Sequence, residues 1–262
     1  MSDFINALHV QTRVVHAFIL RETRTRFGRS KLGYLWAFFE PMAYIVSLLA
    51  IFSVLDRSAP INTSLPLFFL TGIMPWLLFS RTLSAVFSSI ESNAPLLTYP
   101  QVKILDIVLA RVILEFSTLF LVAFIYVLLL FYANELGQIE SLLGVVIVLL
   151  ISSLSGASIG LLGGVVKMYM PAYGAFQSIL IRFLFFTSGI YFVADSLPSV
   201  VVEWLWFNPV LHLIEWMRSV FFLNFESNFL DRIYPIVFLL VSLFFSLMFE
   251  RVARYKLRQI GL

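Results

Sequence analysis

The sequence predicts an all-α integral membrane protein with six transmembrane helices, an N-terminal interfacial amphipathic helix and short outer-leaflet helices between spans five and six. Of its 262 residues, 60% are hydrophobic and 13% are charged, whereas soluble domains usually carry about a quarter charged residues. The apolar residues gather in stretches of roughly 20, the length that crosses a bilayer as a helix. The basic residues instead cluster near the two ends of the chain.

We predict a single transmembrane domain over residues 1–262, with its spans between residues 35 and 249. Each predicted span is a stretch of mostly apolar residues long enough for a membrane helix. The six predicted spans are Leu35–Leu55, Leu65–Phe87, Val108–Tyr132, Leu142–Val166, Ala172–Phe192 and Tyr234–Phe249. Pro75 and Arg81 interrupt the second span.

Residues 1–31 precede the first span and are predicted to form an interfacial helix followed by a basic collar. Their apolar positions recur at helical spacing, with polar residues between them. These positions are Phe4, Ile5, Leu8, Val15, Phe18 and Ile19. The basic residues that follow favour a helix on the cytoplasmic leaflet, and an ordinary soluble helix is the alternative.

The segment Val193–Ile233 separates the fifth span from the sixth. It carries five acidic and two basic residues, which is too many charges for a simple span. It also contains V-V-V-E-W-L-W-F and V-L-H-L-I-E-W-M-R-S-V-F-F, which are typical of short Trp-rich amphipathic helices. Because Trp prefers the membrane–water interface, we expect these helices to lie in, or dip into, the outer leaflet.

The basic residues predict the orientation of the chain, because positively charged segments stay in the cytoplasm. They flank the first and last spans, whereas the loop Ala133–Ser141 has two acids and no base. The basic residues are Arg13, Arg21, Arg24, Arg26, Arg29 and Lys31 at the start, and Arg251, Arg254, Lys256 and Arg258 at the end. We therefore predict that both termini, including the tail 250–262, are cytoplasmic.

The sequence indicates no catalytic group, metal site or cofactor in this chain. It contains no G-x-x-x-x-G-K-[ST] loop for ATP, no cysteine and only three histidines, none at metal-binding spacing. We also expect no nucleic-acid partner.

Small residues recur every four positions in the fourth predicted span, at Ser152, Gly156, Gly160 and Gly164. On a helix they form one smooth stripe, which allows another helix to approach closely. We interpret this stripe as a helix-packing surface rather than as a ligand site.

Charged residues inside the predicted spans are costly and usually face protein or water. They are Glu40, Arg81, Arg111, Glu115 and Arg182. Arg111 and Glu115 are four residues apart and could form a structural ion pair along one helix face. Glu40 could instead cap a helix N-terminus. Arg81 is the best single candidate for contacting a polar substrate.

Aromatic residues gather near the inner end of the first predicted span, at Trp36, within the second span, at Trp76 and Phe79, and on the outer side. The more ordinary interpretation is an aromatic belt at the lipid headgroups. The alternative is that some of them line a conduit, because sugars pack their C–H faces on aromatic rings.

Three stretches resemble a known family. T-R-F-G-R-S-K-L-G-Y-L-W-A-F-F-E-P-M is similar to the start of the first span in permeases of type-2 ABC exporters. More narrowly, it resembles the inner-membrane permease of bacterial capsule-polysaccharide exporters. F-F-L-T-G-I-M-P-W-L-L-F and L-L-T-Y-P-Q-V-K-I-L-D also resemble this family, and the similarity extends over essentially the whole chain.

The resemblance implies a homodimer in the bacterial inner membrane, bound to two copies of a cytoplasmic ABC ATPase that holds ATP and Mg. The implied substrate is a lipid-linked capsular polysaccharide, and periplasmic and outer-membrane export proteins are further implied partners. By the same analogy the conduit includes Trp36, Glu40, Trp76, Phe79 and Arg81. The ATPase would dock on Val14–Lys31 and Glu91–Asp106, through Arg21, Arg24, Arg26, Arg29, Lys31, Tyr99, Gln101 and Lys103.

Other functions remain open at this point. A type-2 ABC permease for O-antigen, teichoic acid or a drug would share these features. A secondary transporter would need paired, interrupted helices in inverted halves, and no such internal symmetry is visible. A membrane-embedded transferase would need clustered acids or histidines at one membrane face.

Overall fold

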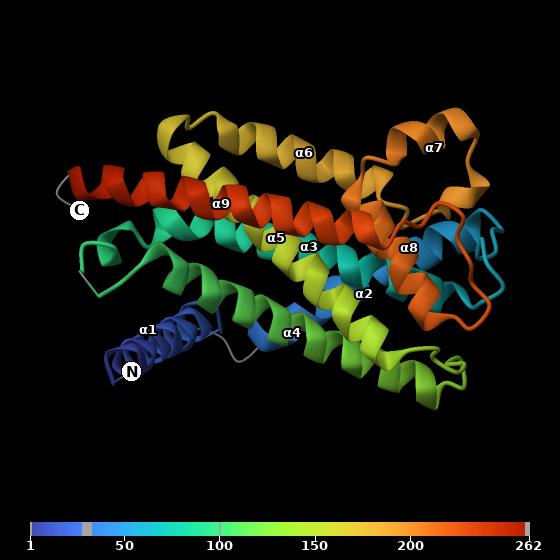
Figure 1. The fold of residues 1–262 in the computed structure, drawn as a ribbon. Helices are drawn as coiled ribbons and strands as arrows, with labels where there is room; N and C mark the ends of the chain where they lie inside the picture. Colours follow the sequence, from blue (N-terminus) through green and yellow to red (C-terminus); the bar gives the residue numbers. More distant parts are fainter. Residues whose placement is uncertain (1, 28–32, 100, 260–262) are drawn as a thin grey trace.

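The computed structural model describes residues 2–27, 33–99 and 101–259, and the chain is helical throughout its regular elements (Figure 1). The helices are α1 (Ser2–Phe27), α2 (Gly33–Val54), α3 (Leu65–Ser92), α4 (Ile104–Tyr132), α5 (Leu142–Tyr169), α6 (Tyr173–Thr187), α7 (Ser199–Leu205), α8 (Pro209–Phe221) and α9 (Ile233–Gln259). Two 3-10 turns, η1 (Ala94–Leu96) and η2 (Ala194–Ser196), complete the described elements. The all-α prediction is therefore confirmed.

Four of the described helices are long and apolar enough to cross a membrane: α3, α4, α5 and the Ile233–Arg254 part of α9. Shorter apolar helices cover Phe39–Val54 within α2 and the whole of α6. All six run roughly along one direction (Figure 1). Helix α1 and the C-terminal end of α9 lie at one end of the bundle, and α7 and α8 lie at the other.

Helix α3 is the centre of the bundle, and every residue from Leu67 to Ser80 is buried. Helix α5 packs closely against it through its small residues. A Cβ atom built on Gly160 would come 2.5 Å from the Leu83 carbonyl oxygen, and one built on Gly156 would overlap the Phe79 carbonyl. The two backbones therefore touch directly along the stripe of small residues.

Most of the predicted spans have somewhat different ends in the structure; α3, for example, continues past Phe87 to Ser92. Helix α6 stops at Thr187, five residues before the predicted end at Phe192, because the chain turns at Gly189 with a φ of 78°. This left-handed conformation is cheap for glycine and ends helices. Helix α9 instead continues through the predicted tail to Gln259, with an ion pair of 2.6 Å between Arg254 and Glu250 on successive turns.

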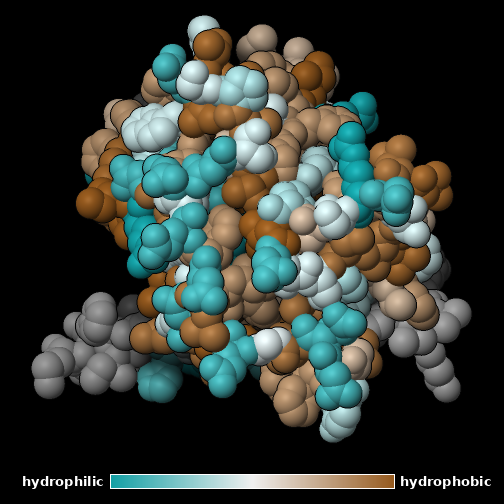
Figure 2. All heavy atoms as spheres, turned by 90° about the vertical axis from the view of Figure 1, so that its right-hand side faces the viewer, coloured by the Kyte–Doolittle hydropathy of each residue, from teal (hydrophilic) through white to brown (hydrophobic). Residues whose placement is uncertain are grey.

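The far end of the molecule contains both helices of the predicted outer segment, but the two differ in environment. Helix α7 is exposed, with Trp204 79% accessible. Every residue of α8 is buried, in contact with α3, α5 and α9. The surface of this end carries hydrophilic residues among hydrophobic ones (Figure 2). The prediction that both helices lie at the outer leaflet is therefore wrong for α8, which is packed inside the protein, and stays a prediction for α7.

Helix α8 tolerates burial because its charged side chains have partners. The Arg218 guanidinium donates hydrogen bonds to the carbonyls of Phe192 (2.9 Å) and Gly189 (2.8 Å), and lies 3.3 Å from the Glu215 carboxylate. It also stacks 4.1 Å from the centre of the Phe68 ring. Burial raises the pKa of Glu215, whereas the neighbouring Arg218 lowers it. Arg218 therefore ties the end of α6 to α8 and to α3.

We expect Arg218→Met to reduce the free energy of unfolding by about 3–5 kcal/mol, because it leaves a buried carboxylate without its partner. Thermal unfolding of the purified protein in detergent measures this loss. Arg232→Met is the matched control, since Arg232 is an exposed arginine close to the same segment. Equal unfolding temperatures for the two variants would contradict the role given to Arg218.

Candidate functional site

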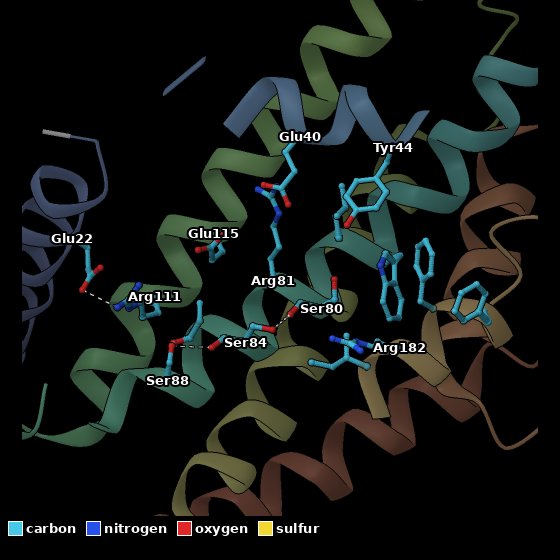
Figure 3. Close-up of a pocket in the computed structure, with 16 residues that line it drawn as sticks. Glu22, Glu40, Tyr44, Ser80, Arg81, Ser84, Ser88, Arg111, Glu115 and Arg182 are labelled. Carbon is cyan, nitrogen blue, oxygen red and sulfur yellow. Dashed lines mark hydrogen bonds and ion pairs between the residues drawn. The ribbon is translucent and has the colours of Figure 1, made fainter. Parts of the chain in front are cut away.

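A pocket of about 890 Å³ opens between α2, α3, α4 and α6, with α1 at its edge (Figure 3). Charged and serine side chains line it together with aromatic and aliphatic ones, and the larger part of its surface is apolar. The polar lining residues are Glu22, Glu40, Ser80, Arg81, Ser84, Ser88, Arg111, Glu115 and Arg182. Charged groups inside apolar helices are expensive, so their convergence on one cavity marks it as the leading candidate site.

An ion pair between Glu40 of α2 and Arg81 of α3 crosses the pocket (Figure 3). The Arg81 side chain is 12% exposed and the Glu40 side chain is 41% exposed. Helix α2 starts at Gly33 and continues through Pro41, so Glu40 lies inside the helix. The alternative interpretation of Glu40 as an N-terminal cap is therefore wrong.

A second ion pair, of 2.9 Å, joins Arg111 of α4 to Glu22 of α1. The sequence suggested that Arg111 would pair with Glu115 along α4. The structure gives Arg111 a partner from another helix. Glu115 lines the same pocket one turn away and is 2% exposed, and both Arg111 and Glu115 have further interactions. Spacing along the sequence could not predict Glu22 as a partner of Arg111, because α1 and α4 meet only in the folded chain.

Serine hydroxyls extend the polar surface along one side of α3. Ser80, Ser84 and Ser88 recur every four residues, so they lie on one face of the helix. The Ser84 and Ser88 hydroxyls each donate to the carbonyl four residues earlier, at 2.8 and 3.0 Å. Their lone pairs remain available to accept hydrogen bonds from a ligand.

Aromatic rings form the other part of the pocket lining. Trp76 lies 5.4 Å from Phe185, and Tyr44 lies 6.2 Å from Phe185, measured between ring centroids. Phe186 completes this group. Such a lining is complementary to both parts of a sugar. Aromatic rings can pack against its C–H faces, and the hydroxyl and charged groups can form hydrogen bonds with its hydroxyls.

A second feature lies at the end of the bundle that carries α1. Phe18 of α1 packs against Ile107 and Ala110 of α4, together with apolar residues of the 94–102 segment. Arg21 donates to the Asn93 side chain at 2.6 Å, and Gln11 donates to Asp106 at 3.1 Å. We call α1 with residues 93–106 the α1–η1 unit.

Comparison with known proteins identifies the family. Residues 13–222 match the family model for the ABC-2 type transporter. The chain belongs to the ABC-2 type transporter family. The polysialic acid transport protein KpsM of Escherichia coli is 34% identical over 247 residues, which cover 94% of this chain and 95% of that protein.

Two further relatives of this ABC-2 type transporter carry names from capsule export. The capsule polysaccharide export inner-membrane protein CtrC of Neisseria meningitidis serogroup B is 27% identical over 94% of this chain and 93% of its own length. The protein of the same description, BexB, of Haemophilus influenzae is 25% identical over 84% of this chain and 83% of its own length.

The predicted conduit residues of this ABC-2 type transporter divide between the pocket and other places. Glu40, Trp76 and Arg81 line the pocket. Phe79 is buried in the core, 2% exposed. Trp36 is 70% exposed and lines a neighbouring pocket on α2, which also includes Glu40 and Tyr44. The serines and Phe185 were missed, although the four-residue spacing of the serines around Arg81 could have indicated them.

The predicted docking residues lie on or near the α1–η1 unit where the structure describes them. Arg24, Tyr99, Gln101 and Lys103 are exposed, and Arg21 contacts Asn93. Arg29, Lys31 and the side chain of Arg26 lie outside the described residues. The unit thus brings two segments that are far apart in the sequence onto one surface.

Proposed function

We propose that this ABC-2 type transporter is the permease subunit of an ATP-driven exporter that moves lipid-linked capsular polysaccharide across the bacterial inner membrane. The observation that carries the proposal is the group of charged and serine side chains that line one open pocket between apolar helices. The chain also has relatives over most of its length that are named for polysialic acid transport and capsule polysaccharide export. A sugar chain needs such a lining because its hydroxyls cannot be desolvated in lipid without replacement hydrogen bonds.

In this proposal the chain crosses the membrane six times, as one domain, with both termini in the cytoplasm. The four long helices, together with α2 and α6, provide the crossings. The orientation follows from the excess of basic residues in the segments before α2 and after the apolar part of α9. The outer segment, with α7 and α8, then faces the periplasm.

The proposed assembly contains two copies of the chain, related through the face that α2 and α6 present. Glu40 and Arg182 are accessible on this face at positions well inside their helices. Lipid would be a poor neighbour for both charges, whereas a second copy would enclose the two pockets in one polar conduit. Such a conduit would keep the charged groups in contact with water or substrate.

We propose that two copies of a cytoplasmic ABC ATPase, which bind ATP and Mg, drive this assembly through the α1–η1 unit. The pair between Glu22 and Arg111 connects that unit directly to the pocket. Closure of the ATPase pair would shift α1, and α1 would pull on α4 and change the width of the conduit. Periplasmic and outer-membrane export proteins would then receive the polymer.

Deletion of the gene for this protein, followed by localisation of the polysaccharide, tests the proposal. We expect the polymer to remain in the cytoplasm, and export to return when the gene is restored. Co-purification of an ABC ATPase, whose vanadate-sensitive hydrolysis depends on this chain, is the biochemical counterpart. Normal surface capsule in the deletion strain would contradict the proposed substrate. Loss of surface O-antigen with normal capsule would show that O-antigen is the substrate instead.

A further inference from the structure

A second pocket, of about 550 Å³, lies at the end of the bundle that carries α7 and α8 (Figure 1). Its lining residues fall within 61–67, 134–138 and 221–225, in or beside the loops that follow α2, α4 and α8. We call it the loop pocket. It lies at the opposite ends of α3 and α4 from the α1–η1 unit, so in the proposed orientation it opens to the periplasm.

Six polar side chains of the loop pocket can bond to a ligand without giving up a bond within the protein. Among the described residues, none of the six has a hydrogen-bond or ion-pair partner. They comprise four carboxamides and two hydroxyls, at Asn62, Thr63, Ser64, Asn134, Gln138 and Asn224. A carboxamide both donates and accepts hydrogen bonds, as a sugar hydroxyl does. The set is therefore complementary to an uncharged ligand that is rich in hydroxyls.

Ser64 provides a separate indication of a ligand. It occupies the position just before α3, where a serine hydroxyl usually accepts a hydrogen bond from the second or third N–H of the helix. Pro66 is the second residue of α3 and has no N–H, and the Ser64 hydroxyl makes no capping bond. Its oxygen is buried and has no hydrogen-bond partner among the described residues. Because a buried hydroxyl without a partner is costly, a ligand hydroxyl in the loop pocket would supply the missing bond.

The remaining lining indicates the chemistry of that ligand. Phe222 and Phe225 are partly buried and line the loop pocket, and aromatic rings pack against the C–H faces of sugars. Glu135 is the single charged side chain among the described lining residues. Without a basic side chain this lining offers no ionic partner to a carboxylate or a phosphate, and its one charge repels them. The loop pocket thus favours an uncharged sugar over an acidic one.

We infer that the loop pocket binds uncharged sugar units. The carboxamides and the Ser64 hydroxyl bond to the sugar hydroxyls, while Phe222 and Phe225 pack against its C–H faces. This inference goes beyond the proposed function, from which it takes only the periplasmic orientation. Uncharged sugar units have two sources on that side of the membrane, the chain that leaves the transporter and other glycans of the envelope.

Binding of fluorescent oligosaccharides to the full-length protein in nanodiscs of zwitterionic lipid tests the inference. The neutral probes are oligomers of glucose, galactose, mannose and N-acetylglucosamine, and oligogalacturonate is the acidic probe. We expect at least one neutral probe to bind in a way that depends on the loop pocket. Binding of oligogalacturonate is expected to be independent of the loop pocket, because Glu135 has no basic neighbour in the described lining.

Two variants change the loop pocket at little cost to the fold. A Cβ atom at Gly137 meets no atom within 4 Å, and its backbone is outside the left-handed region, so Gly137→Trp fills the pocket and weakens neutral-probe binding roughly tenfold or more. Asn224→Ala removes one carboxamide and weakens it about fivefold, the effect of one neutral hydrogen bond. Asn228→Ala is the matched control, because Asn228 is an exposed asparagine of the same loop outside the pocket. An unchanged unfolding temperature confirms that each variant is folded.

Each outcome has one interpretation. Weaker neutral-probe binding in both variants, with Asn228→Ala and oligogalacturonate binding unchanged, supports the inference. Competition by capsular polysaccharide isolated from the same strain then assigns the sugar to the exported chain, and lack of competition assigns it to another glycan. Equal binding of every neutral probe by the wild type and both variants overturns the inference, as does a wild-type protein that binds none of them. Normal capsule in the deletion strain contradicts the proposed function instead and leaves the binding results as they stand.

Discussion

Gly156→Val is expected to reduce the free energy of unfolding by more than about 3 kcal/mol, at the upper end of the usual cost of overpacking. The reason is that a side chain at this position overlaps the Phe79 carbonyl. A backbone group cannot rotate away as a side chain can, so α5 must separate from α3. The amount of protein in the membrane, and its unfolding temperature in detergent, measure the effect.

Gly137→Val is the control for this variant, because a Cβ atom at Gly137 has no neighbour within 4 Å. Gly156→Ala is expected to be intermediate, since its single methyl group still meets the Phe79 backbone. A Gly156→Val protein as abundant and as stable as Gly137→Val would show that α3 and α5 do not pack through this stripe.

Reversing the two charges of the Glu40–Arg81 pair is expected to distinguish the effect of the pair on stability from its effect on export. Glu40→Ala and Arg81→Ala each leave one charge of the pocket without its partner, which costs roughly 1.5–3 kcal/mol, with the lower value favoured by the exposure of Glu40. We expect each to reduce export by roughly tenfold or more. In Glu40→Arg/Arg81→Glu the pair is restored, so the unfolding temperature recovers.

Export is expected to stay low in that double variant if Arg81 contacts the substrate, because a carboxylate then occupies its place. Quantified surface polysaccharide, together with ATPase stimulation by the purified permease, distinguishes the two results. Full recovery of export would mean that the pair only supports the fold. Normal export and normal ATPase stimulation in both alanine variants would remove Glu40 and Arg81 from the site altogether.

The bundle was predictable to a large extent because membrane helices are specified by local composition. Runs of apolar residues identified α2 to α6 and α9, since every spanning segment must satisfy its backbone internally and cover itself with apolar side chains. The four-residue repeat of Ser152 to Gly164 likewise indicated a packing face. Helix ends were less predictable, because α6 stops where Gly189 turns the chain.

The pocket was predictable only in part. Charge inside a span marked Glu40 and Arg81, because such residues need a partner or water wherever the helix lies. Their pairing across α2 and α3 is a fact of the tertiary structure. The same holds for Phe79, whose aromatic character suggested the conduit but whose position on α3 faces the core.

By itself the sequence determined that this protein is helical, that it belongs in a membrane, and which residues share a face of each helix. Only the tertiary structure decided which faces meet: that α1 reaches the pocket through Glu22, that α8 is buried, and that Arg182 has no described acidic partner. The physical reason is that periodicity along one helix is set by residues a few positions apart. Contacts between helices depend instead on packing among segments that are distant in the chain.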